Sequence, residues 1–223
     1  MLIKYIIKST KRNEEFDIVI DDNSNERVIY KQEDFPDWTK LGFLQCPHCP
    51  LSSNEIKYCP VAKSLTTLVN QCGQVISCEN VHLIVHFEHR TYVHYTTAAR
   101  AMSSLMGLLF ATSGCPKTNF LKPMARFHLP LATQEETIYR VASSFLLGKF
   151  FSNKAGADNR IDLSGLSENY DDLNIVNLWI AKRLRASEEL AELNALTELD
   201  LFTQIIPISI EEHLADLTHV FFQ

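Results

Sequence analysis

Alternating apolar and polar positions in the first part of the chain predict short β-strands. Residues 2–7 and 16–20 are rich in Ile, Val, Tyr and Phe and flank a polar turn, which indicates a β-hairpin. A third short strand is expected over residues 27–31, so that a three-stranded meander opens the chain. Residues 81–87 place apolar side chains at every second position, which predicts a strand with one buried face.

Apolar positions at helical spacing dominate the rest of the chain. The expected helices cover residues 61–71, 96–112, 133–151, 171–199 (one broken helix or two) and 209–222. Two of them begin with a capping box, Thr133 with Glu136 and Ser209 with Glu212. These boxes mark the helix starts independently of the apolar spacing.

These elements together predict an α+β fold, in which an N-terminal antiparallel β-meander and short strands pack with a mainly helical C-terminal half. A polar stretch containing Gly156 and Gly165 suggests a boundary. We therefore expect an α+β domain over residues 1–152 and a helical layer over residues 153–223, packed on the same domain.

Composition and charge argue against a nucleic acid or a membrane as the partner of this protein. The 223 residues include 27 acidic and 21 basic side chains, for a formal net charge of −6, which argues against a nucleic-acid surface. The one dense basic run, residues 182–185, is interpreted as a solvated helix face. No stretch approaches the ~20 apolar residues of a membrane span and no signal peptide is visible, so we expect a cytoplasmic protein without a membrane partner.

The cysteines fall into two groups by their context. Six cysteines and eight prolines in this chain should give about 0.2 Cys-Pro pairs by chance, yet there are four. These pairs begin at Cys46, Cys49, Cys59 and Cys115. Cys72 and Cys78 lack the following proline and are interpreted as core residues.

A set of four thiols in a reducing compartment predicts a metal site, because disulfides are rare there and four is the ligand number of a structural zinc or an iron–sulfur cluster. Proline fixes its own φ and holds the preceding cysteine in an extended conformation, so each ligand loop is stiff. An alternative without metal is four buried thiols that happen to precede turn prolines.

The choice of metal favours an iron–sulfur cluster over zinc. Zinc knuckles commonly need a glycine with positive φ after the second cysteine, and Pro50 stands at that place. Cysteine followed by proline also ends bacterial ferredoxin motifs, although the ferredoxin spacing itself is absent. The sequence is compatible with either an iron–sulfur cluster or a zinc ion.

Five segments of the chain resemble those of a bacterial protein family of unknown function. The matching segments are Gln45-Cys46-Pro47-His48-Cys49-Pro50-Leu51, Tyr58-Cys59-Pro60-Val61-Ala62, Leu105-Met106-Gly107, Ser113-Gly114-Cys115-Pro116 and 120–130. The resemblance covers about residues 40–150. It implies a soluble bacterial protein and supplies no activity.

Three functions are compatible with these features. The first is a metal-stabilised binding or regulatory module, with another protein as its partner. The second is an iron–sulfur redox sensor or electron carrier. The third is an enzyme that binds an anionic substrate through Lys122, Arg126 and His128, although no catalytic triad, phosphate-binding loop or dinucleotide fingerprint is visible. We expect the protein not to be an enzyme, since a closed four-thiolate site leaves no open ligand position.

Overall fold

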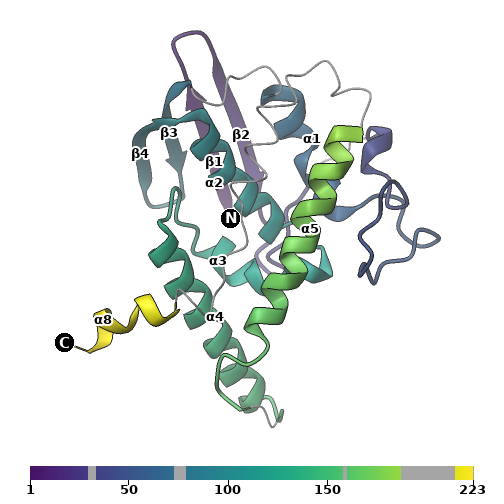
Figure 1. The fold of residues 1–223 in the computed structure, drawn as a ribbon. Helices are drawn as coiled ribbons and strands as arrows, with labels where there is room; N and C mark the ends of the chain where they lie inside the picture. Colours follow the sequence, from purple (N-terminus) through teal and green to yellow (C-terminus); the bar gives the residue numbers. More distant parts are fainter. Residues whose placement is uncertain (30–33, 73–78, 158–159, 187–213, 223) are drawn as a thin grey trace.

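The computed structural model describes residues 1–29, 34–72, 79–157, 160–186 and 214–222. Four strands form one antiparallel sheet in the order β2-β1-β3-β4 (Figure 1). The strands are β1 (Leu2–Lys8), β2 (Asn13–Val19), β3 (Asn80–His86) and β4 (Thr91–Thr97).

The N-terminal hairpin is confirmed, with Tyr5 opposite Phe16 in the register of β1 and β2. The expected third strand of a meander is wrong over its described part, where only Arg27 forms an isolated bridge, to Ile20. The free edge of β1 pairs instead with β3, about 75 residues later. Strand β3 was predicted; the edge strand β4 was not, because most of its side chains are exposed on both faces.

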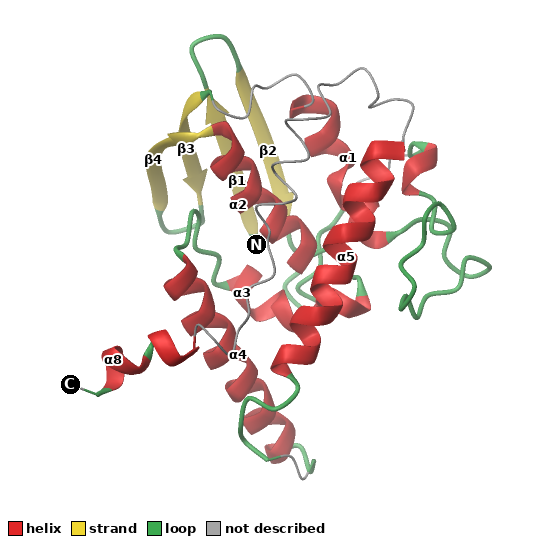
Figure 2. Ribbon diagram, viewed as in Figure 1, coloured by secondary structure: helices red, strands yellow, loops and turns green. Residues whose placement is uncertain are grey.

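The helices over residues 60–72 and 98–111 pack on the sheet, and the other long helices extend away from it, as Figure 2 shows. The described helices are η1 (Asp37–Thr39), α1 (Pro60–Cys72), α2 (Ala98–Ala111), η2 (Pro116–Leu121), α3 (Lys122–Arg126), α4 (Gln134–Lys154), α5 (Leu166–Ala186) and α8 (Thr218–Phe221). The α+β class is therefore confirmed. Helix α4 begins with the predicted capping box of Thr133 and Glu136. The second predicted box lies outside the described residues.

The core extends from the sheet through helices α1 and α2 to α5. It includes Tyr5, Ile18 and Leu83 of the sheet, Leu105 of α2 and Ile180 of α5. The same core therefore includes residues on both sides of the proposed boundary at 152/153. That boundary falls in the last turn of α4 and stays a prediction. Within the described residues, no helix has the length and apolar character to cross a bilayer.

Candidate metal centre

The four cysteines that precede proline line one small cavity, of about 20 Å³. All four are free thiols; Cys59 and Cys115 are buried, and Cys46 and Cys49 are half-buried. They come from separate segments, and Cys115 is 56 residues beyond Cys59 in the chain. The structure thus brings together the four residues that the Cys-Pro pattern selects.

Cys46 and Cys49 lie on the loop between η1 and α1, which we call the ligand loop (residues 40–59). The Cys49 amide donates a 3.0 Å hydrogen bond to the Cys46 carbonyl, so the pair forms a tight turn. A bridge between Lys40 and Tyr58 closes the base of the loop. The first two thiols are therefore held on a closed loop at the edge of the core.

Cys59 lies directly before the first residue of α1, Pro60. Its amide donates to the Thr39 carbonyl at 2.8 Å, and its carbonyl accepts from the Lys63 amide at 2.9 Å. Hydrogen bonding from the amides of Ala62 and Val61 opposes the effect of burial on the pKa of the Cys59 thiol. The cysteine thus occupies a helix N-cap position, where backbone donors favour a negative charge.

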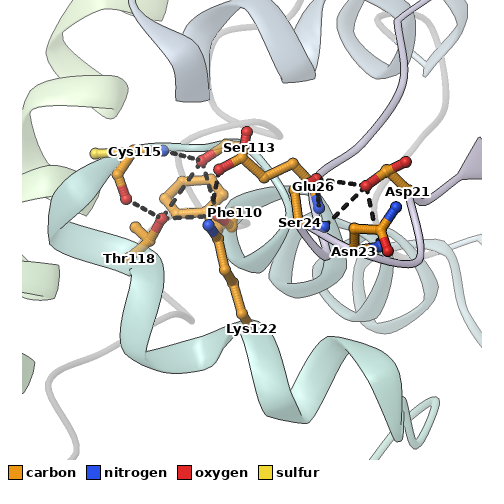
Figure 3. Close-up of polar contacts among 9 residues, drawn as sticks. All are labelled: Asp21, Asn23, Ser24, Glu26, Phe110, Ser113, Cys115, Thr118 and Lys122. Carbon is orange, nitrogen blue, oxygen red and sulfur yellow. Dashed lines mark hydrogen bonds and ion pairs between the residues drawn. The ribbon is translucent and has the colours of Figure 1, made fainter.

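Cys115 repeats this arrangement at the start of η2, where it is the N-cap and Pro116 follows. A hydrogen bond from the Lys117 amide likewise opposes the effect of burial on the pKa of the Cys115 thiol. Figure 3 shows the backbone of Cys115 held from both sides: its amide donates to Ser113 Oγ at 3.2 Å, and its carbonyl accepts from Thr118 Oγ1 at 3.2 Å. Cys115 follows the C-terminus of α2, where the helix dipole disfavours a negative charge. Because η2 begins at Cys115, its backbone amides offset this effect on the thiol.

The N-cap positions give a second reason for the Cys-Pro pairs. Proline is favoured as the first residue of a helix, where its missing N–H costs nothing. Pro60 and Pro116 take that position. At these two pairs the proline therefore starts a helix behind the cysteine in addition to stiffening the backbone.

Arg183 of α5 also lines this cavity, together with Lys117. It is 1% exposed, and its guanidinium donates to the carbonyls of Trp38, Lys40 and Leu41 at 2.9, 2.7 and 2.9 Å. Its Nε has no hydrogen-bond partner. Among the described residues it forms no ion pair with a carboxylate, so a buried positive charge lies beside four thiols. The interpretation of residues 182–185 as a solvated face is wrong at this position.

The surroundings raise the pKa of Cys46, Cys59 and Cys115 and so keep these thiols protonated unless a cation is present. Burial, with smaller contributions from the charges of Cys59 and Cys49, raises the pKa of Cys46 to about 12, although Arg183 acts in the opposite direction. Burial likewise raises the pKa of Cys115 to about 11. A bound cation would reverse this balance, since coordinating thiols lose their protons.

His48 connects the ligand loop to α5. Its Nε2 lies 3.0 Å from the carbonyl oxygen of Asp172 and 3.3 Å from its Oδ1. Lys117 Nζ donates to Oδ2 of the same carboxylate at 2.7 Å. Asp172 thus joins one residue beside Cys49 and another beside Cys115, and it holds both ligand segments on one helix.

As the side chains stand, no group of three or more His, Cys, Asp or Glu residues in the described part of the chain could hold a metal ion. The four sulfurs share one cavity without converging on a single ion. A tetrahedral zinc requires all four at ~2.3 Å from one point.

The three residues considered for anion binding do not form one site. Lys122 pairs with Glu26 at 2.7 Å, and Arg126 pairs with Asp22. His128 is buried and contacts the Tyr5 hydroxyl. Both cations are thus paired with carboxylates, and His128 lines a cavity to which Lys122 and Arg126 do not contribute.

A family model described as a domain of unknown function (DUF6901) matches residues 2–222. The chain belongs to this family. No curated protein and no solved structure matched the DUF6901 chain. The match agrees with the resemblance to a family of unknown function.

Arg183, His48 and Asp172 of this DUF6901 protein were missed as site residues. One signal for Arg183 exists in the sequence: it follows Val176 and Ile180 at helical spacing, so it falls on the apolar stripe of α5. The contacts of His48 with Asp172 leave no local pattern, because 124 residues separate the two. Cys72 and Cys78 cannot be compared with expectation, since the side chain of the first and all of the second lie outside the described residues.

Proposed function

We propose that this protein is a regulatory module built around a four-thiolate iron–sulfur centre, held by Cys46, Cys49, Cys59 and Cys115. The observation that carries the proposal is the shared cavity of these four thiols beside the buried guanidinium of Arg183. A bound metal centre would give a physical reason both for four free thiols at one cavity and for a buried positive charge beside them.

Charge balance links the thiols to Arg183. Four thiolates around a dication leave a net charge of about −2, and an anion in a low-dielectric site needs a nearby positive charge. A buried guanidinium has the complementary need, since its desolvation is costly without an anionic partner. The metal-bound centre supplies that partner to Arg183, whose hydrogen bonds are otherwise to neutral carbonyls.

The choice of a cluster over zinc rests on the sequence around the second cysteine. Pro50 stands where a zinc knuckle commonly has a glycine with positive φ, and proline cannot adopt that φ. Cysteine followed by proline is also a feature of bacterial ferredoxin motifs.

The position of the centre supports a regulatory role rather than a catalytic one. It joins the ligand loop to the starts of α1 and η2 and to α5, so loss of the cluster would free the loop. Leu44 and Ile56 of that loop are exposed apolar side chains, and such side chains are available to a protein partner. We infer that the state of the cluster controls how the loop is presented.

Anaerobic purification followed by iron, sulfide and zinc analysis tests the proposal. We expect iron and acid-labile sulfide in stoichiometric amounts, with absorbance at about 400 nm. Replacing Cys115 with Ser should lower the iron content, whereas Cys72→Ser, the matched control, should leave it unchanged. Colourless protein with one zinc would overturn the cluster and keep the four-thiolate site. Protein with no metal under these conditions would overturn both.

A further inference from the structure

A second and much larger cavity lies among α2, α3, α4 and α5, and no cysteine lines it. Its volume is about 750 Å³, within the ~300–1,000 Å³ typical of small-molecule sites. Most of its wall is apolar. The apolar side chains include Leu108, Leu121, Met124, Leu129, Leu131 and Leu173.

Gly107 in the middle of α2 keeps this cavity open. A Cβ built on Gly107 would meet no atom within 4 Å, and the residue lines the cavity. Glycine inside a helix costs ~1 kcal/mol relative to alanine. A side chain would therefore fit sterically and help the helix, but it would occupy the cavity.

One end of the cavity carries neutral hydrogen-bonding groups. His128 lines it, and the Tyr5 hydroxyl contacts both the His128 ring and, at 3.0 Å, Ser104 Oγ. Burial lowers the pKa of His128 to about 3, with smaller contributions from Arg140 and Arg90, so its ring is neutral. Ser103 also lines the cavity, and its Oγ is buried without a hydrogen-bond partner.

Two arginines supply positive charge. Arg100 of α2 and Arg140 of α4 both line the cavity. Arg140 Nη2 donates to the carbonyls of Met124 and Phe127 at 2.9 and 2.7 Å, which fixes its guanidinium. Among the residues that the structure describes, neither arginine pairs with a carboxylate. The charge of Glu136 acts on Arg140 without forming an ion pair with it. In a protein of net charge −6, two cations at one apolar cavity still favour an anion locally.

We propose that this cavity binds a small amphipathic carboxylate, whose apolar body lies along Gly107 and the leucines and whose carboxylate is bound by Arg100 and Arg140. The combination follows the general pattern of ligand sites, in which apolar walls supply affinity and a few charged groups orient the ligand. It is independent of the metal centre, because the two cavities share no residue.

Displacement of the fluorescent probe anilinonaphthalene sulfonate from the full-length protein tests this proposal. Octanoate and octan-1-ol have the same chain length and differ in charge. We expect octanoate to displace the probe about three- to tenfold more effectively than octan-1-ol, the range for partly exposed charge-assisted contacts. Arg100→Gln should remove this preference. Arg126→Gln is the matched control, since Arg126 is a cation outside the cavity.

Gly107→Met tests the location of the site. The methionine should fill the cavity and weaken both compounds at least ~10-fold, while Gly107→Ala confirms that a helix substitution by itself is tolerated. Equal displacement of the probe by octanoate and octan-1-ol would overturn the proposal that the cavity recognises a carboxylate. Unchanged binding in Gly107→Met would overturn the location, and no displacement by octanoate in any protein would overturn the proposal as a whole.

Discussion

The Nη2 atom of Arg183 donates a 2.9 Å hydrogen bond to the carbonyl of Leu41, which lies 142 residues earlier in the chain. This contact attaches α5 to the base of the ligand loop and brings a full positive charge next to the thiols. Arg183 therefore combines a structural and an electrostatic role.

Replacing Arg183 with Met should lower the free energy of unfolding by about 2–4 kcal/mol, because three carbonyls, two of them in buried hydrogen bonds, lose a charged donor. The iron content of anaerobic protein should fall as well, since the anionic centre loses its countercharge. Urea unfolding and iron analysis measure the two effects. The exposed Arg185 of the same helix supplies the control, and Arg185→Gln should change neither. A stable variant with full iron content would contradict the charge argument.

Replacing His48 with Ala should release the ligand loop from α5. The imidazole contact with Asp172 at 3.0 Å is lost, so the loop should open more often and be cleaved faster in limited proteolysis. Mass spectrometry locates the cuts, which we expect within residues 40–59. Asn54→Ala changes an exposed side chain of the same loop and should not alter the cleavage rate. Equal rates in both variants would show that His48 does not restrain the loop.

The neutral, buried His128 should make stability depend on pH. Its pKa in the folded protein is lowered to about 3 by burial, whereas the unfolded chain has the ordinary value of ~6.5. The unfolded state therefore binds more protons between these values, and stability falls as the pH drops below about 6.5. The slope is at most ~1.4 kcal/mol per pH unit.

Urea unfolding at pH 7.5 and pH 5.0 measures this dependence. In His128→Gln the loss of stability between the two pH values should be clearly smaller than in the wild type. His82→Gln, which changes an exposed histidine of β3, should retain the wild-type loss. An unaltered pH dependence in His128→Gln would place its origin elsewhere.

The same substitution should have opposite effects at two glycines. Gly107→Ala should stabilise the protein by about 0.5–1 kcal/mol, because a helical glycine with open space gains helix propensity. Gly165→Ala should destabilise it, because Gly165 has a φ of +87° that alanine adopts with strain. Thermal unfolding of the two variants gives the comparison. Destabilisation by Gly107→Ala would show that the space beside α2 is not open in solution.

The sequence by itself determined the features that depend on neighbouring residues or on a regular period. The Cys-Pro context selected Cys46, Cys49, Cys59 and Cys115, because each proline acts on the residue beside it. The capping box of Thr133 and Glu136 located the start of α4 for the same reason: its hydrogen bonds span three residues. Alternation in β3 identified its buried face.

Only the tertiary structure decided how distant segments pair. Strand β3 pairs with β1 at the position expected for the third strand of a meander. The edge strand β4 has too few buried side chains to produce an alternating apolar pattern in the sequence. The burial of Arg183 depends on carbonyls more than 140 residues away. Such pairings depend on the free energy of packing the whole chain, which cannot be inferred from a short segment of sequence.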